Sequence, residues 1–297
     1  MTKSLQERNF RTEPSLRRGL TLRRLKVVLK KPTLFFENLK FMRGAHPSQE
    51  KHIFVLGPPR NGTTLMQRLI SGHSSICALD FETRFFFIRN YTYFSKSEVP
   101  VDAYAKLIRE ARDAVDLFDR IARFHKDNEG RSMFLEKTPE HALRLKYLTS
   151  KFPNSKFILI VRDCRDGYLS AKRNPRCKVQ TPYSYASVWR KSVRQYLGLN
   201  KKSFGSIQLV KYEDLCSRPE VVVADIMNFL GVPFEREQLS PNKVAQTTVS
   251  SFQGHQRLTE KISAKTVGQW KQKLNDVDRQ TLMKMCGKEM KALGYTE

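Results

Sequence analysis

The sequence predicts an α/β fold of three layers, in which helices cover both faces of a central, mostly parallel sheet. Three short apolar runs are typical of buried parallel strands, and they span residues 52–56, 156–161 and 207–212. Longer segments with apolar residues three or four positions apart separate these runs, which is the pattern of amphipathic helices. Strands that alternate with helices in this way favour a sheet with helices on each face.

Each helix is predicted from its apolar spacing and from the residues that begin or end it. Residues 63–71 follow the first strand directly, and residues 102–125 form a long segment with a continuous apolar face. Proline and glycine mark the ends of several helices, since proline fits a first turn and glycine fits the position after a last turn. The remaining predicted helices are 140–152, 183–200, the segment from Pro219 to Gly231, and 277–293.

The chain of 297 residues divides into a basic extension, residues 1–50, and a main domain, residues 51–297. Seven Lys and Arg residues lie between Arg17 and Lys31, with leucines at helical spacing among them. Two interpretations remain open for this basic N-terminal helix. It packs on the main domain, or it makes a peripheral contact with a membrane surface.

The formal net charge of +25 indicates which partners the protein can bind, and it gives no information about the fold. A non-enzymatic protein that binds polyanions is one alternative, although no zinc finger, basic zipper or RNP-type strand is present, so we expect no nucleic-acid partner. Five cysteines without a C-x-x-C spacing predict neither a disulfide framework nor a zinc site. With no apolar run of about 18 residues and no signal peptide, we expect a cytoplasmic protein.

The segment GPPRNGTT, residues 57–64, has the order of a phosphate-binding loop between a strand and a helix. Gly57 and Gly62 are five positions apart, as in nucleotide-binding loops, and glycine lets backbone N–H groups approach an anion. The candidate donors are the N–H groups from Asn61 to Thr64, together with the hydroxyls of Thr63 and Thr64. A phosphate-loop-like fold with a nucleotide-type ligand is therefore predicted.

This loop lacks the lysine that contacts the outer phosphates in ATPases, because Thr63 stands in its place and Arg60 supplies the basic group instead. A nucleoside triphosphatase is thus disfavoured, and a nucleotide or metabolite kinase stays an alternative. Arg162 follows a buried strand and Ser170 comes eight residues later, so the two side chains are candidates for a second anion site. An ion pair between Arg162 and a neighbouring aspartate explains the same pattern.

Four segments resemble the sulfotransferase superfamily, whose donor is 3′-phosphoadenosine-5′-phosphosulfate (PAPS). In this sequence they read GPPRNGTT, FILIVRDCRDGYLSAKR, VKYEDLCSRPEVVVADIMNFLGVPF and VGQWKQKL. The resemblance implies that the loop residues Arg60 to Thr64 hold the 5′-phosphosulfate, and that Arg162 and Ser170 hold the 3′-phosphate. Tyr212, in the third segment, is a further donor-binding candidate.

Within that superfamily the chain is most similar to tyrosylprotein sulfotransferases and to their bacterial and carbohydrate-modifying relatives. The resemblance implies Glu82 of the sequence ETR as the catalytic base and Lys137 of EKTP as an assisting group, with Arg60 stabilising charge and no metal required. Two other interpretations stay open: His73 is the base, or Glu82 is an ion-pair partner of Arg84.

The sequence departs from those relatives in ways that bear on the acceptor. They have an arginine four residues beyond the serine, whereas this chain has Asn174 there and Arg173 beside it. The resemblance implies an acceptor hydroxyl on a saccharide, a lipid or a protein tyrosine, and this departure leaves the choice among the three open. An aromatic cluster after Glu82 is either a wall for the acceptor or part of the core, and it comprises Phe81, Phe85, Phe86, Phe87, Tyr91 and Tyr93.

Overall fold

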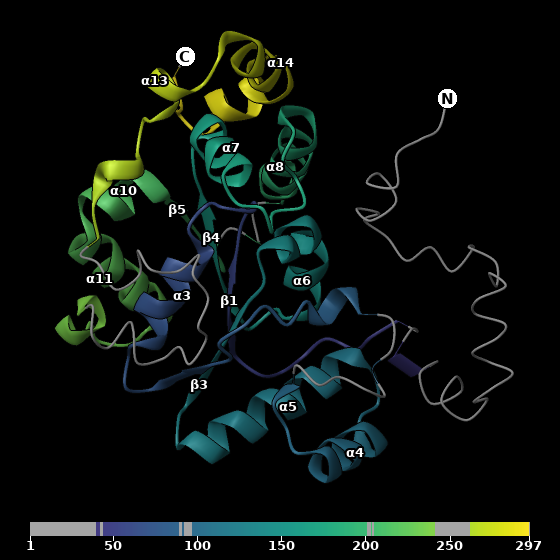
Figure 1. The fold of residues 1–297 in the computed structure, drawn as a ribbon. Helices are drawn as coiled ribbons and strands as arrows, with labels where there is room; N and C mark the ends of the chain where they lie inside the picture. The colour runs from purple at the N-terminus through teal and green to yellow at the C-terminus, as the bar shows by residue number, and fades with distance from the viewer. Residues whose placement is uncertain are drawn as a thin grey trace, which may run out of the picture.

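The computed structural model describes residues 40–41, 44–88, 91, 97–200, 203, 205–240 and 262–296. Its centre is a five-stranded sheet with the order β2-β3-β1-β4-β5, and every neighbouring pair of these strands is parallel. Helices cover both faces, which confirms the predicted three-layer fold (Figure 1). Across the described ranges, no helix is both long and apolar enough to cross a bilayer. The basic segment 17–31 lies outside the described residues.

The three predicted strands are present, and two further strands complete the sheet. The apolar pattern missed the two additional strands for different reasons: β2 is only three residues long, and β3 ends in the charged residues Glu136 and Lys137. The strands are β1 His52–Leu56, β2 Ile76–Ala78, β3 Met133–Lys137, β4 Lys156–Val161 and β5 Ile207–Lys211.

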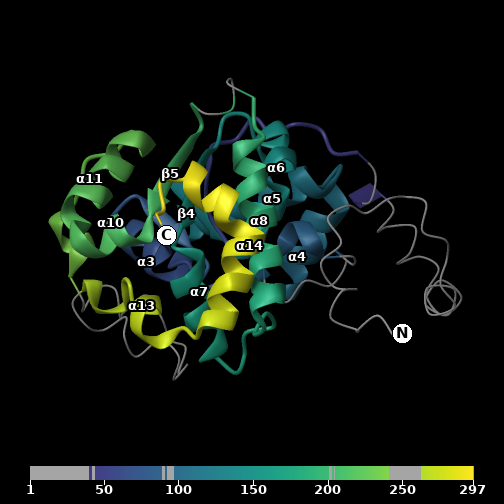
Figure 2. The ribbon, with the colours of Figure 1, turned by 90° about the horizontal axis from the view of Figure 1, so that it is seen from above.

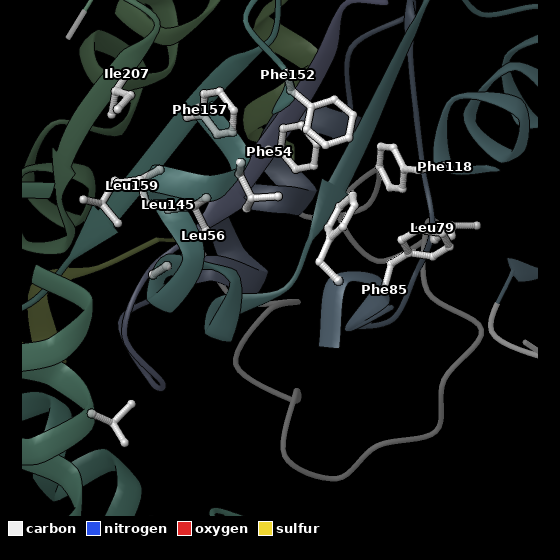
Figure 3. Packing of buried hydrophobic residues seen from close by; sticks show 14 of the residues in the cluster. Phe54, Leu56, Leu79, Phe85, Phe118, Leu145, Phe152, Phe157, Leu159 and Ile207 are labelled. Atoms are coloured by element: carbon white, nitrogen blue, oxygen red, sulfur yellow. The ribbon is translucent and has the colours of Figure 1, made fainter. Parts of the chain in front are cut away.

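Side chains alternate across β1 and feed two separate apolar clusters, one on each face of the sheet. Phe54 and Leu56 belong to the larger cluster, whereas Ile53 and Val55 belong to the smaller one. In the larger cluster, the rings of Phe54 and Phe157 stack at 5.1 Å, beside Phe118 and Phe152 (Figure 3). Both faces of the central strand are therefore dry, as expected for a parallel sheet.

The helices divide between the two faces. On the face of the larger cluster, α8 and α14 lie side by side with α6 and α7 nearby, and α5 packs against β2 and β3, while α3, α10 and α11 cover the opposite face (Figures 1 and 2). The bounds are α3 Thr63–Ser71, α4 Val101–Glu110, α5 Ala114–Glu129, α6 Leu145–Lys151, α7 Cys164–Lys172, α8 Pro182–Leu197, α10 Tyr212–Ser217, α11 Pro219–Leu230, α13 Trp270–Lys273 and α14 Asp276–Ala292.

The prediction of one helix over 102–125 is wrong, because the chain forms α4 and α5 with a break at residues 111–113. Asp113 is the cap of α5, where its carboxylate accepts hydrogen bonds from the N–H groups of Val115 and Asp116. The apolar spacing runs through the break because residues of both helices reach the same core. The segment predicted as a helix over 140–152 likewise begins as a 3₁₀ helix, Pro139–Arg144, before α6.

Replacing the cap by Asp113→Ala should lower the free energy of unfolding by about 1–2 kcal/mol, as for other helix caps. Asp102→Ala is the matched control, because Asp102 also lies in the first turn of a helix but is exposed. Urea unfolding at pH 7 measures both values. Equal stability of the two variants would contradict the capping role.

The free energy of unfolding that Asp113→Ala loses should also depend on pH. Burial acts to raise the pKa of Asp113, but hydrogen bonds from the N–H groups of His46, Asp116 and Val115 and from the His46 ring outweigh it and hold the pKa below its ordinary value of 3.8. A lowered folded-state pKa gives stability that is complete above about pH 4 and is lost as the pH falls through the folded pKa. The gap between wild type and Asp113→Ala should therefore shrink below pH 4.

Candidate functional site

The sequence-predicted site residues follow four parallel strands at their carboxyl ends. The loop 57–62 follows β1, Lys137 ends β3, Arg162 follows β4 and Tyr212 follows β5. Glu82 comes shortly after the remaining strand, β2. Because the carboxyl ends of parallel strands meet at one edge of a sheet, the fold gathers these residues where α/β proteins bind ligands.

Two glycines let the loop pack directly against its neighbours. A Cβ atom on Gly57 would lie 2.2 Å from the carbonyl oxygen of Ile160 in β4, a contact that backbone cannot relieve. Gly62 has a φ of 97° and caps α3, and a Cβ there would lie 2.5 Å from the Tyr212 ring. The loop therefore sits against β4 and Tyr212 at a distance that only glycine allows.

The side chain of Asn61 is fully buried and ties the loop to two other elements. Its Nδ2 donates to the carbonyl of Pro59 and to the hydroxyl of Tyr185 in α8, both at 2.9 Å. Its Oδ1 accepts the backbone N–H of Arg162 at 2.7 Å. Asn61 can therefore offer a ligand only its backbone N–H, which is the group that the sequence predicted for it.

The first turn of α3 faces the loop with unpaired donors. The first backbone hydrogen bond of the turn runs from Met66 N–H to the carbonyl of Gly62 at 3.0 Å. Among the described residues, no side chain caps this helix, so the N–H groups of Thr63 and Thr64 and the helix dipole suit an anion.

Arg60 has a φ of 64°, in the left-handed region, and its Nε lies 3.4 Å from Oγ of Ser170 in α7. The sequence assigned Arg60 to the phosphosulfate and Ser170 to the 3′-phosphate. The structure instead brings the two side chains within hydrogen-bonding distance of each other. Arg60 therefore reaches from the loop to the helix that carries the second predicted anion site.

Arg162 is buried at the end of β4, and its guanidinium carbon lies 4.5 Å from the centre of the Tyr212 ring. One terminal nitrogen donates to the carbonyl of Thr266. Its Nε is buried and has no hydrogen-bond partner among the described residues. Within the same part of the chain, no hydrogen bond joins Arg162 to Ser170, so their convergence on one anion stays a prediction.

The aspartates near Arg162 are largely used elsewhere. Asp163 pairs with Arg165 at 2.7 Å, whereas the nearest oxygen of Asp166 is 3.9 Å from Arg162. Asp166 accepts the backbone N–H groups of Gly268 at 2.6 Å and Trp270 at 2.9 Å. Burial raises the pKa of Asp166 against the opposing effects of Arg162 and these N–H groups. A loose ion pair between Arg162 and Asp166 is therefore present, as the alternative interpretation expected, but it leaves the Nε of Arg162 without a hydrogen-bond partner among the described residues.

Glu82 and Lys137 lie together at the other half of the same edge. Lys137 Nζ is 3.5 Å from Glu82 Oε1, and the exposed fractions of the two side chains are 4 % and 41 %. Arg84 pairs instead with Glu140, at 3.3 Å. The structure therefore pairs Glu82 with Lys137 and not with Arg84. Glu82 and Lys137 are the residues that the resemblance implied as base and assisting group.

His73 lies at the opposite edge of the sheet, beyond the last turn of α3. Its Nε2 is 3.0 Å from the carbonyl of Pro233, and its Nδ1 accepts the N–H of Ser75 at 3.0 Å. Ser75 in turn binds the N–H of Met133, at the start of β3. Lys137 is at the end of that strand, about 13 Å away at about 3.3 Å per residue. This placement does not support His73 as the base.

Most of the described part of the aromatic cluster belongs to the core. Phe85, Phe86 and Tyr91 are buried in the larger apolar cluster. Phe87 is half-buried and stacks on His141, with ring centres 5.7 Å apart. Tyr93 lies outside the described residues. The core interpretation thus fits Phe85, Phe86 and Tyr91, and the partly buried Phe81 packs against the same cluster, so Phe87 is the described candidate for an acceptor wall.

Known proteins match most of this chain. A family model described as "Sulfotransferase family" matches residues 52–236. A putative protein-tyrosine sulfotransferase from Caenorhabditis briggsae is 29 % identical over 197 residues, which cover 64 % of this chain and 69 % of the relative. Nodulation protein NoeE of Sinorhizobium fredii is 26 % identical over 283 residues, which cover 82 % of this chain and 66 % of the relative. Protein-tyrosine sulfotransferase 1 of Danio rerio is 26 % identical, with 61 % and 53 % covered. The chain thus spans about half to two thirds of these relatives.

Solved structures share the fold at low sequence identity. The sulfotransferase domain of the Synechococcus PCC 7002 olefin synthase has a TM-score of 0.59 and 20 % identity, covering 86 % of this chain and 98 % of that chain. The sulfotransferase domain from the curacin biosynthetic pathway has a TM-score of 0.55 and 20 % identity, with 84 % and 99 % covered. At this identity the likeness establishes the three-layer architecture.

Proposed function

This chain belongs to the sulfotransferase family, and from that premise we propose that it transfers a sulfuryl group from PAPS to a hydroxyl and releases 3′,5′-ADP. One observation supports this donor more than any other. The side chain of Asn61 joins the uncapped helix turn after β1 to the backbone of Arg162 after β4. The two proposed anion-binding features are thereby held at a fixed separation, as a donor with 5′ and 3′ anionic groups requires.

At the 5′ end, the donor would meet backbone N–H groups rather than a lysine. The N–H groups from Asn61 to Thr64 surround the positive end of α3, and the hydroxyls of Thr63 and Thr64 add further donors. Such fixed donors need no reorganisation when charge builds on the leaving phosphate, and a set of them contributes several kcal/mol, roughly, to the transition state.

At the 3′ end, the unpaired Nε of Arg162 supports an anion contact, because a buried donor without a partner is costly in a folded protein. The contact with the Tyr212 ring helps to hold the guanidinium at the end of β4. Ser170 supplies a hydroxyl from α7, and Arg60 already reaches that hydroxyl. Arg162 would make a charge-assisted bond to the 3′-phosphate, and the Ser170 hydroxyl would donate to the same group.

The chemistry requires one bond to form and one to break. The acceptor oxygen attacks sulfur, the bond from sulfur to the 5′-phosphate oxygen breaks, and the hydroxyl proton passes to Glu82. Glu82 suits the base because its half-exposed carboxylate is accessible, whereas Lys137 is buried behind it. Once protonated, Glu82 no longer neutralises Lys137, whose charge then stabilises the sulfuryl oxygens together with Arg60.

The acceptor is proposed as a hydroxyl of a protein tyrosine, a saccharide or a lipid. Two of the relatives above carry names that specify protein tyrosine, so a tyrosine peptide is the first acceptor to test. No observation in the described structure favours a kinase over this proposal. Peripheral membrane contact through residues 17–31 and a cytoplasmic location remain predictions from the sequence.

Replacing the proposed base by Glu82→Gln should reduce single-turnover transfer by about a hundredfold or more, because the near-isosteric amide cannot accept a proton. The assay measures transfer from radiolabelled PAPS to a tyrosine peptide, an oligosaccharide, a long-chain alcohol and p-nitrophenol. Glu220→Gln is the control, since within the described part of the chain Glu220 forms only an exposed pair with Arg236. Transfer by Glu82→Gln within tenfold of wild type would remove Glu82 as the base.

Removing the proposed 3′-phosphate contact by Arg162→Ala should weaken 3′,5′-ADP binding about 10- to 150-fold, the loss of one charge-assisted hydrogen bond. The maximal rate should fall less, since this group is remote from sulfur. Titration calorimetry measures the affinity, with Arg190→Ala as the control because Arg190 binds only the carbonyl of Met285 in the described structure. An unchanged affinity of Arg162→Ala would place the 3′-phosphate elsewhere.

A further inference from the structure

A buried carboxylate lies directly behind the pair formed by Glu82 and Lys137. Glu136, in β3, has a side chain that is 1 % exposed. Its Oε1 accepts the hydroxyls of Thr83 at 2.7 Å and Thr138 at 2.6 Å. Its Oε2 lies 2.9 Å from Nδ1 of His141. One carboxylate thus binds three side chains, which fixes its orientation as well as theirs.

The three partners belong to the two segments that carry the proposed reacting groups. Thr83 directly follows Glu82, Thr138 directly follows Lys137, and His141 lies three residues further along the second segment. Thr138 makes a second link, because its Oγ1 accepts the backbone N–H of Arg84 at 3.0 Å. The hydrogen bonds therefore join two segments that are more than fifty residues apart in sequence, directly beside Glu82 in one segment and beside Lys137 in the other.

Glu136 itself faces away from the reacting groups. Successive side chains of a strand point to opposite faces of a sheet, so Glu136 shares the face of Phe134, in the larger cluster, while Lys137 shares that of Leu135. Burial acts to raise the pKa of Glu136, but His141 and the two threonine hydroxyls outweigh it and leave the pKa lowered. The carboxylate is therefore an ionised, fixed acceptor.

From this geometry we infer that Glu136 is a positioning residue, which holds Glu82 and Lys137 in register through the hydroxyls of Thr83 and Thr138. The inference rests on the proposed sulfuryl transfer. Arg84 has a φ of 54°, an unusual conformation for a side-chain-bearing residue immediately after the threonine that anchors the base. The link from its N–H to Thr138 supports that conformation. Displacement of a reacting group by about 1 Å costs roughly a hundredfold in rate.

The test removes the link and leaves Glu136 in place, since losing the carboxylate would strip three buried donors of their acceptor. Thr83→Val is nearly isosteric and should lower the single-turnover rate about 10- to 100-fold, with the Kd of 3′,5′-ADP unchanged. Thr83→Ser restores the hydroxyl and should restore most of the rate. Ser192→Ala is the matched control, because it removes a buried hydroxyl that, among the residues the structure describes, binds only the carbonyl of Val188 in α8.

A double-mutant cycle separates positioning from a general loss of stability. If Thr83 acts through Glu82, Thr83→Val should have no further effect on the rate in the Glu82→Gln background. An equal loss in both backgrounds would overturn the inference, as would a Thr83→Val rate equal to wild type. The wild-type assay with the tyrosine peptide and p-nitrophenol tests the proposed function itself, so the two failures are distinguishable.

A measurement without an acceptor tests the same link. Hydrogen exchange at the Arg84 amide should be slow in wild type and at least tenfold faster in Thr138→Val, with 3′,5′-ADP bound in both. Thr149→Val, at a half-buried position of α6, is the control and should leave that amide unchanged. Equal exchange at Arg84 in wild type and Thr138→Val would show that the hydroxyl does not hold this segment.

Discussion

The side chain of Asn61 links the loop after β1 to the end of β4, and the arrangement of the donor half of the site depends on this link. Few side chains can do this, because the amide must donate to Pro59 and Tyr185 while it accepts from the backbone of Arg162. The close packing of the loop on β4 also requires Gly57, because a Cβ atom at this position would clash with the backbone of β4. A buried amide with all its hydrogen bonds made is stable and rigid, whereas one missing partner would leave an unpaired polar group.

A second polar centre organises the other half of the sheet edge. The strand order β2-β3-β1-β4-β5 places the loop and Arg162 on the β1 and β4 side, and Glu82 and Lys137 on the β2 and β3 side. Asn61 joins elements within the first half, and Glu136 joins elements within the second. The parallel pairing of β1 with β3 then sets the distance between the two halves. Donor binding and proton removal are therefore proposed to depend on separate networks, and substitutions in one network should affect them differently.

The loop, β1 and β4 were predictable because apolar runs, glycine spacing and proline positions are local signals. β3 was not, since Glu136 and Lys137 end a buried strand with charges that only tertiary partners stabilise. The sequence left open an ion pair between Glu82 and Arg84 as an alternative to the base role, whereas in the structure Arg84, with a φ of 54°, pairs with Glu140. The helix α3 lies between the loop and His73, so His73 is at the end of the sheet opposite to the loop. The structural role of the Asn61 side chain had no sequence signal, since asparagine is common in any loop.

Ligand-dependent thermal stability tests the donor assignment most directly. We expect 3′,5′-ADP at a hundredfold excess over its Kd to stabilise the protein by about 2.7 kcal/mol, measured as a rise in Tm. ATP with Mg²⁺ lacks the 3′-phosphate that Arg162 and Ser170 are proposed to bind, so at the same concentration it should raise Tm less. A larger rise in Tm with ATP and Mg²⁺ than with 3′,5′-ADP would contradict the proposal that this edge of the sheet binds PAPS.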